Sequence, residues 1–472
     1  MADTELATDM LHLRDEFPPV PTADWEAVIQ ADLKGADYDK KLVWRSEEGV
    51  PVRPYYRSEH IQSLRDQTHI PPGAFPYVRG GGSQDWAVVE PGTEPPAGAV
   101  RADLFGDTGG TAVQELAFAL SAGVDRLADA PDVDHTARSL VFVFAIGSNY
   151  FFEIAKLRAA RLLWSRAVSA FKPKAESSCR MHVWARTALW NKSLYDPYTN
   201  LLRVTTEALS AVIGGCEWLE VRPFRFSDRL AVNVQRIVKE EAHLARVADP
   251  AGGSYYVEAL TDALAREGWK LFQEVESKGG FAQARGFIDE QIAASRAAKE
   301  KAMSSRRKVQ VGVNNYPDTE ETLPPEDRPA PQEIWRSAEM FERLRMRTEE
   351  HARRTGKRAN VHLLTRGDLK MRQARAQFCR NLFGCGGFQI TESADLKSDA
   401  DLLVLCSSDA EYQGLAAEVC PLSQQPVIVA GNPKEHIEAL NSTGVAGYVH
   451  VLSNAVDTIA EWQDKLGMGR LS

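Results

Sequence analysis

Short apolar runs alternate with helix-periodic segments along most of the chain. Residues 140–146 form an unbroken apolar run of the kind found in buried parallel strands, and residues 149–171 follow with the composition of a long helix. Between residues 111 and 127 apolar positions recur at i, i+3, i+4 and i+7, which predicts another helix. We expect five or six strands between residues 86 and 223. Repeated strand-then-helix units favour a parallel sheet, open or closed into a barrel.

This alternation stops at a proline-rich, acidic segment and then resumes with shorter units. Residues 314–332 show no periodicity, which predicts an interdomain linker. The strands expected beyond it are 361–364, 388–391, 402–406, 427–430 and 447–451. Five such units predict a doubly wound, flavodoxin-like domain, whose ligand would lie outside the C-terminal ends of the strands.

The first residues of the chain are expected to form an arm that belongs to neither domain. After three prolines comes an apolar stripe at helical spacing, formed by Trp25, Val28, Ile29 and Leu33. We expect a short helix that lies on another surface, and the alternative is a frayed terminus. The expected organisation is an arm (1–40), a β/α barrel domain (41–315), a linker (316–355) and a flavodoxin-like domain (356–472).

Composition narrows the class of protein. The 472 residues are 44% hydrophobic and 26% charged, with a net charge of −9, which is typical of a globular protein and argues against a nucleic-acid partner. No segment resembles a signal peptide or a membrane span, so we expect a cytoplasmic protein. The six cysteines show no CxxC spacing, which favours buried free thiols over disulfides or zinc ligands.

Six segments of the chain can be compared, in order, with those of a known family. They are 42–55, 149–164 (Asn-Tyr-Phe-Phe-Glu-Ile-Ala-Lys-Leu-Arg-Ala-Ala-Arg-Leu-Leu-Trp), 196–203, 207–215, 247–256 and 312–317. These segments resemble the methylmalonyl-CoA mutase family, and residues 149–164 look like the family signature. The resemblance is closest to the small (beta) subunit, in a shortened form. It implies a TIM-type β/α barrel, complete or incomplete, that threads acyl-CoA through its axis, followed by a B12-binding-type domain.

The resemblance also implies that the catalytic residues are missing. In catalytic chains a Tyr-His pair faces the substrate and the corrin, and the segment 109–112 aligns with the end of that motif so that Asp103 and Leu104 occupy the positions of the pair. Leucine offers neither a proton nor a hydrogen bond. Catalytic chains also carry many more residues between Gly80 and Asp103, including barrel strands and residues that hold CoA. We therefore expect no catalytic residue in this chain.

The C-terminal loops depart from the family in the same way. Residues 367–371 stand where the family has Asp-x-His-x-x-Gly, whose imidazole coordinates cobalt, and no histidine occurs between His362 and His436. The degenerate cofactor loops contain Gly367, Asp368, Ser407, Ser408 and Gly431. Such small residues could accommodate a nucleotide, but tight turns need them equally. We expect this chain to bind no cofactor and no metal, with adenosylcobalamin held by a partner.

The leading hypothesis is a non-catalytic subunit of a heterodimeric methylmalonyl-CoA mutase, an isomerase of propanoate metabolism. The large catalytic subunit would interconvert (R)-methylmalonyl-CoA and succinyl-CoA, and this chain would support assembly and stability. One alternative is a catalytic acyl-CoA mutase with a degenerate site, although His362 in a predicted strand and His436 in a predicted helix are poorly placed for cobalt. Another is a stand-alone protein that binds CoA esters or nucleotides. A large exposed apolar surface would favour the subunit.

Some conspicuous residues have plain structural interpretations. His182 and His243 have no motif around them and are expected to be structural. The glycine-rich segment 249–253 lacks the order of a dinucleotide loop and is expected to be a turn before a helix. The basic residues of 156–166 are expected to form a solvated or ion-paired helix face, with a CoA phosphate site as the alternative.

Overall fold

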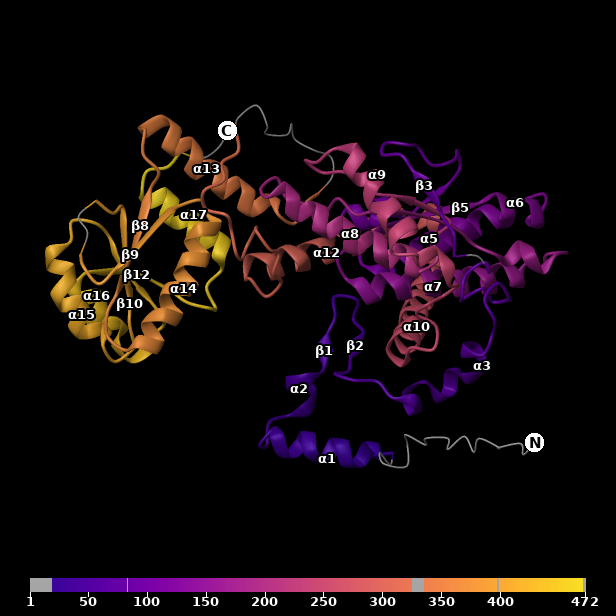
Figure 1. Ribbon diagram of the computed structural model, residues 1–472, viewed down its shortest axis with the longest axis horizontal. Helices are drawn as coiled ribbons and strands as arrows, with labels where there is room; N and C mark the ends of the chain where they lie inside the picture. Colours follow the sequence, from indigo (N-terminus) through magenta and orange to yellow (C-terminus); the bar gives the residue numbers. More distant parts are fainter. Residues whose placement is uncertain (1–18, 83, 325–334, 397–398, 470–472) are drawn as a thin grey trace, which may run out of the picture.

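The computed structural model describes residues 19–82, 84–324, 335–396 and 399–469. Two α/β units lie side by side along its long axis, each built around a five-stranded parallel sheet (Figure 1). The predicted α/β class with parallel sheets is therefore confirmed. No helix in these ranges is long and apolar enough to cross a membrane.

The first sheet is open in the described residues. Its strands, all parallel, run in the order β3 (Ala87–Val89), β7 (Trp218–Glu220), β6 (His182–Thr187), β5 (Val141–Ile146) and β4 (Val100–Arg101). The two outer strands, β3 and β4, each pair with one neighbour, so no eight-stranded closed barrel forms here.

Successive residues of β5 face opposite sides of this sheet. Phe142 and Phe144 pack into the main core beneath the helices, whereas Val141 and Val143 join a small cluster on the other face. The helices over the main core are α5 (Ala112–Ala128), α7 (Tyr150–Ala170), α8 (Pro197–Ile213) and α10 (Tyr255–Ser277). Thr111 begins α5 with a capping box that includes Gln114, so the predicted start of this helix is confirmed.

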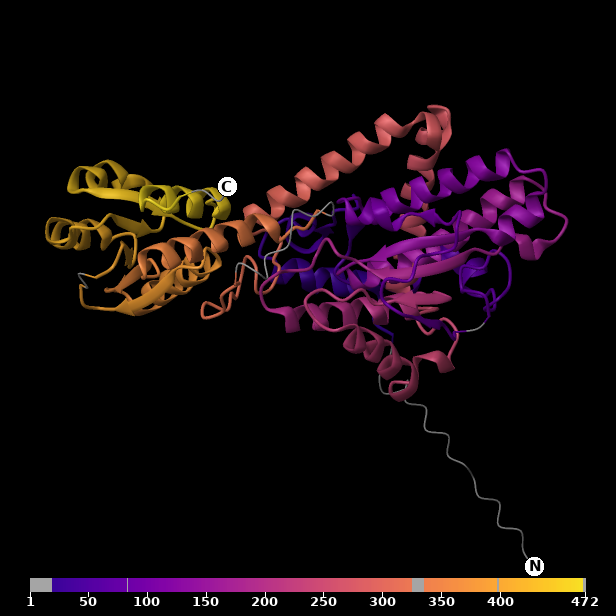
Figure 2. The ribbon, with the colours of Figure 1, turned by 90° about the horizontal axis from the view of Figure 1, so that it is seen from above.

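The remaining elements of the first unit are short, apart from one long helix. They are α4 (Asp103–Asp107), α6 (Val133–Ser139), α9 (Asp228–Arg236) with a π turn (Ile237–Glu241), α11 (Gly280–Gln283) and α12 (Arg285–Ser304). Figure 2 shows α12 running diagonally toward the second unit, where it contacts α17 (Ala455–Lys465).

The arm precedes both units and lies beside the first unit, below it in the view of Figure 1. Its helix is α1 (Thr22–Asp32), and α2 (Tyr38–Leu42) begins at its end. The hairpin of β1 (Trp44–Arg45) and β2 (Pro51–Val52) and the helix α3 (Arg65–Thr68) follow the arm, and Val50 and Val52 pack into the main core of the first unit. None of the residues of α1 is buried. Its Trp25 ring meets Tyr55 edge-on at 5.2 Å between centroids and lies under the Arg57 guanidinium at 4.8 Å. Residues 1–18 of the expected arm lie outside the described ranges.

The second unit is doubly wound. Its sheet has the order β12 (Val445–Val449), β11 (Val427–Ala430), β10 (Leu402–Cys406), β8 (Asn360–Thr365) and β9 (Gln389–Ser393), which is flavodoxin-like. One core cluster lies under α14 (Leu369–Cys385) and α17, and the other lies under α15 (Tyr412–Val419) and α16 (Ile437–Thr443). Five cysteines are buried and Cys420 is half-buried, and all six are free thiols.

A partly buried helix joins the two units. Residues 339–355 of the expected linker form α13 (Glu339–Thr355). The carboxylate of Glu342 accepts a hydrogen bond from the backbone N–H of Leu194 at 2.7 Å, and the Arg345 guanidinium lies 4.0 Å from the ring centroid of Tyr195. Arg345 also donates to the carbonyl of Glu321 at 2.6 Å. These contacts tie the second unit to the end of β6 and the start of α8.

Candidate functional site

A chain of ion pairs occupies the C-terminal end of the first sheet. The carboxylate of Asp103, fully buried at the start of α4, accepts two hydrogen bonds of 2.8 Å from Arg101 of β4. Arg186 of β6 reaches the same carboxylate at 3.2 Å and lies 2.6 Å from Glu220 of β7. The positions expected for the Tyr-His pair therefore hold Asp103, whose carboxylate is engaged by two guanidinium groups, and Leu104. Leu104 is 51% exposed.

The face of the sheet below these ion pairs is packed with apolar side chains. Trp184 and Trp218 stack with their ring centroids 6.2 Å apart, and Val89, Val141 and Val143 complete the cluster. Period-two alternation places Arg186 on the same face as Trp184. This face is held together by stacking and by charge pairing.

Lys156, on α7, lies in a second buried group of charges. Its ammonium contacts Glu115 at 3.2 Å and Glu153 at 2.6 Å and donates to the carbonyl of Ala145 at 2.5 Å. Burial raises the pKa of Glu115 to about 8, and the nearby Glu153 adds to this effect against the attraction of Lys156. One ammonium between two carboxylates leaves excess negative charge, which stabilises the protonated form of Glu115.

The neighbouring basic residues of α7 are also engaged within the protein. Arg158 is fully buried and pairs with Asp249 and Glu258. Arg161 donates to the carbonyl of Gly214 at 2.6 Å, and burial lowers the pKa of its guanidinium to about 10. Among the four basic residues of 156–166 only Arg166 is exposed. Of the two forms expected for this helix face, the ion-paired one is confirmed for Lys156 and Arg158. Arg161 instead donates to backbone carbonyls, and all three side chains are buried rather than solvated.

The loops at the C-terminal ends of β8 and β10 meet at one carboxylate, that of Glu411. It accepts hydrogen bonds from the hydroxyls of Ser407 at 2.7 Å and Ser408 at 2.6 Å and from the backbone N–H of Asp368 at 3.1 Å. These hydrogen bonds, that of Ser408 first, lower the pKa of Glu411 to about 2. A Cβ at Gly367, where φ is +81°, would collide with the same carboxylate.

Four of the five residues expected in the cofactor loops thus lie together, but the group that they surround is the carboxylate of Glu411, which belongs to the chain itself. The fifth, Gly431, lies apart, next to Asp409 and Arg375. Sequence reasoning missed Glu411, although Ser408-x-x-Glu411 has the spacing of a capping box. In a flavodoxin-like sheet the crevice between the first and third strands is where ligands bind. Here the donors that a ligand's anionic group would use already bind Glu411.

These residues do not fit a cobalt-ligating site. His362 is fully buried in β8, where its Nδ1 lies 2.9 Å from the Thr391 hydroxyl and its Nε2 lies 3.0 Å from the carbonyl of Asp395. Both ring nitrogens are therefore engaged away from the 367–371 loop. Within the described residues no group of three or more His, Cys, Asp or Glu side chains could hold a metal ion.

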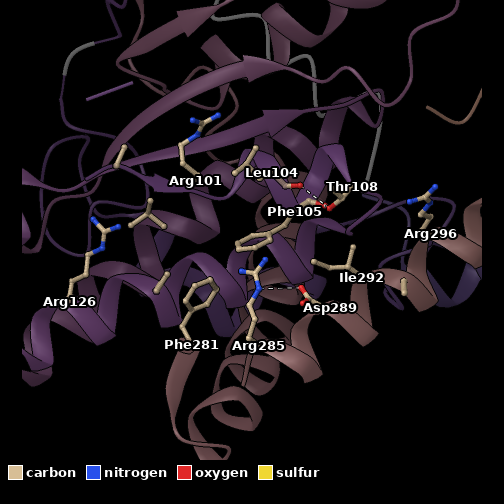
Figure 3. A pocket seen from close by; sticks show the side chains of 14 residues that line it. Arg101, Leu104, Phe105, Thr108, Arg126, Phe281, Arg285, Asp289, Ile292 and Arg296 are labelled. Atoms are coloured by element: carbon tan, nitrogen blue, oxygen red, sulfur yellow. Dashed lines mark hydrogen bonds and ion pairs between the residues drawn. The ribbon is translucent and has the colours of Figure 1, made fainter. Parts of the chain in front are cut away.

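A pocket of about 520 Å³ lies on the helix-covered side of β4 (Figure 3). Its lining comes from β4, α4, α5, α11 and α12, and includes the apolar side chains of Leu104, Phe105, Phe281 and Ile292. Four arginines also line it: Arg101, Arg126, Arg285 and Arg296. No single segment carries this pattern, so the pocket could not be predicted from the sequence.

Comparison with known proteins places the chain in a family. A family model described as methylmalonyl-CoA mutase matches residues 99–364. The methylmalonyl-CoA mutase small subunit of Porphyromonas gingivalis is 31% identical over 627 aligned positions, which cover 98% of this chain and 100% of that protein. The chain belongs to the methylmalonyl-CoA mutase family. The 627 positions exceed the 472 residues of this chain, so the relative carries segments that this mutase-family chain lacks.

Other mutase relatives match over part of their length. The probable small subunit of Mycobacterium tuberculosis is 35% identical over 349 residues, and the small subunit of Streptomyces virginiae is 36% identical over 346 residues. These matches cover 68% and 67% of this chain but only 56% of either relative, so the chain spans about half the length of both. The expected resemblance to mutase small subunits is confirmed.

Proposed function

We propose that this chain is a non-catalytic subunit of a heterodimeric, adenosylcobalamin-dependent methylmalonyl-CoA mutase in the cytoplasm. A large partner chain would hold the cofactor and interconvert (R)-methylmalonyl-CoA and succinyl-CoA. The observation that carries the proposal is the pairing of Asp103 with Arg101 and Arg186 at the positions of the family's Tyr-His pair. A carboxylate that two guanidinium groups saturate is not available to act on a substrate.

The strand order supports descent from a TIM-type barrel that has lost strands. From β4 to β7, neighbours in the sheet are consecutive in the chain, and β3 lies next to β7. A barrel opened between β3 and β4 would have this order. The resemblance places the missing residues between Gly80 and Asp103, in the same region. With Trp184 and Trp218 packed on the inner face, acyl-CoA would have no axial path.

The second unit supports the same conclusion for the cofactor. We infer a degenerate B12-binding-type domain, because its flavodoxin-like order persists while Glu411 takes up the donors of the ligand crevice. Adenosylcobalamin supplies the radical chemistry of this family, and in the proposed complex it is bound by the partner. The residues of this chain contribute folding and contact surface.

The arm supports a role in assembly. The relatives are named as small subunits, which implies a large subunit. Helix α1 presents Trp25, 44% exposed, and Val28, 62% exposed, and buries none of its residues. An amphipathic helix with an open apolar face suits a groove on another chain. This favours a subunit over a stand-alone protein that binds CoA esters.

Co-expression with a long mutase chain that retains Asp-x-His-x-x-Gly tests the proposal. Size-exclusion chromatography with light scattering should show a 1:1 complex, and mutase activity should follow the long chain. The purified short chain with adenosylcobalamin and (R)-methylmalonyl-CoA should form no succinyl-CoA. Turnover by the short chain alone would support the alternative of a catalytic mutase with a degenerate site. Failure to associate with the long chain would support the stand-alone alternative.

A further inference from the structure

The pocket beside β4 is a concave site that the assembly role does not use. Its volume of about 520 Å³ falls within the range of small-ligand sites. It lies outside the sheet, among α4, α5, α11 and α12, and thus away from the face that carries Trp184 and Trp218. It borders the free edge of β4.

The floor of the pocket is apolar. The rings of Phe105 and Phe281 face each other edge-on with centroids 5.9 Å apart, and both lie at the centre of the site in Figure 3. Leu104 and Ile292 extend this surface on one side. The ion pairs around Asp103 do not explain why Leu104 is exposed. Its position in the wall of the pocket does, because an apolar side chain that lines a cavity remains accessible to solvent. An acyl chain or an aromatic ring would be buried against these groups.

The charges around this floor are mostly positive. Four arginines and one acid, Asp289, line the pocket, although the chain as a whole has a net charge of −9. Arg101 is bound to Asp103, and Arg296 lies 3.1 Å from Glu300. Arg126 donates to the carbonyl of Gly98, which carries no negative charge. This leaves the charge of Arg126 for a ligand.

Arg285 is the most adaptable cation of the site. Figure 3 shows its guanidinium turned into the cavity between Phe281 and Asp289. Its contact with Asp289 measures 3.3 Å, and both side chains are more than half exposed. Such a pair contributes little free energy, so a ligand anion can replace the carboxylate at small cost. A guanidinium binds carboxylate and phosphate alike, through two parallel hydrogen bonds.

We propose that this pocket binds an amphipathic anion. Its acyl or aromatic body lies on Phe105 and Phe281, and its carboxylate or phosphate binds Arg285 and Arg126. The residues that line the site all belong to the first unit, and they include Arg101 and Leu104 beside the ion pairs of Asp103. Carboxylate and phosphate ligands are distinguished by experiment.

Isothermal titration of the full chain with octyl phosphate, octanoate and octanol tests the proposal. We expect 1:1 binding of octyl phosphate or octanoate, and binding of octanol at least about tenfold weaker, because octanol lacks the charge. The stronger of the two anions identifies the head group. The substitution Arg285→Ala should weaken anion binding about tenfold or more. Asp289→Asn should strengthen it, since the competing carboxylate is removed.

A matched pair on α10 provides the control. Asp262 and Arg266 form an i,i+4 contact of 2.7 Å outside the pocket, in which Arg266 is 70% exposed and Asp262 is 26% exposed. Arg266→Ala and Asp262→Asn should leave the dissociation constants unchanged, and all four variants should unfold at the temperature of the wild type because exposed pairs contribute little. Absence of binding by both anions, equal binding of octanol, or an Arg285→Ala variant that binds like the Arg266→Ala control would overturn the proposal.

Discussion

The Nη1 atom of Arg186 lies 3.2 Å from Oδ2 of Asp103, and this contact joins β6 to the first turn of α4. The carboxylate is completely buried and the guanidinium nearly so. A buried charge is tolerated only with a partner, because transfer out of water costs several kcal/mol per ion. Asp103, which we expect at the position of the family's catalytic pair, thus has a structural task in this chain.

Replacing Asp103 by alanine should strongly destabilise the first unit. The change leaves Arg101 and Arg186 without their shared carboxylate, which costs about 3–5 kcal/mol for a buried pair. Urea unfolding followed by circular dichroism measures the free energy of unfolding. Asp262→Ala, at a pair on α10 whose arginine is 70% exposed, is the control and should cost less than about 1 kcal/mol. Equal losses in the two variants would contradict a structural role for Asp103.

Restoring the family motif should not restore catalysis. A chain with Asp103→Tyr, Leu104→His and Lys370→His would still have Trp184 and Trp218 packed where a substrate would enter. Radical intermediates also need a closed site that excludes water. With adenosylcobalamin and (R)-methylmalonyl-CoA, succinyl-CoA should stay at the level of the cofactor-free control in a variant shown to be folded. A rate clearly above that level would reopen the catalytic interpretation.

The isolated chain should not bind cobalamin with useful affinity. No imidazole lies in the 367–371 loop, Lys370 brings a cation there, and Glu411 holds the loop donors. Titration with hydroxocobalamin at micromolar protein should leave the corrin spectrum unchanged. A shift from the base-on to the histidine-bound spectrum would show that another residue supplies the ligand.

Glu411 should stabilise the second unit in a pH-dependent way. Its pKa is lowered from 4.5 to about 2 in the folded chain, so the stabilisation is present above pH 4.5 and is lost as the pH falls toward 2. Glu411→Gln keeps the shape but removes the charge. The difference in free energy of unfolding between wild type and variant should be constant from pH 7 to pH 5 and shrink below pH 4.5. A difference that grew on acidification would contradict this assignment.

A charge on the apolar face of α1 should weaken the complex with the large chain. Val28→Asp places a carboxylate in the expected interface, whereas Ala27→Asp places it on the opposite, exposed face of the same helix. Affinity measured with purified partners should fall for Val28→Asp and stay unchanged for Ala27→Asp. Deletion of residues 1–40 should weaken the complex further. Unchanged affinity after the deletion would place the interface elsewhere.

The sequence predicted where helices and strands lie along the chain better than it predicted which of them are in contact. The apolar run 140–146 and the periodicity of 111–127 identified β5 and α5, because burial alone determines both patterns. The placement of β3 beside β7 depends on residues about 130 positions apart, which no local pattern records. A prediction from hydrophobic patterns also places every lysine at the surface. Lys156 is buried because Glu115, 41 residues away, packs against it.

Residues of the candidate site were identified from the sequence where they lie within, or next to, a short family motif. Asp103, Ser407 and Asp368 were identified by alignment with motifs, and the structure describes the ion pairs and hydrogen bonds of each. Glu411 was missed because its partners come from two loops that only the fold brings together. The pocket at β4 was missed for the same reason, since its arginines lie on separate elements.

The open sheet has one further consequence, for the behaviour of the protein in concentrated solution. Unpaired strand edges are templates on which other chains can add strands and aggregate. The two edges here, β3 and β4, are three and two residues long, too short to present a row of free N–H and C=O groups. The connection between them carries Pro91, Pro95 and Pro96, whose nitrogens have no hydrogen to donate. A sheet with edges this short can end there without recruiting strands from other molecules.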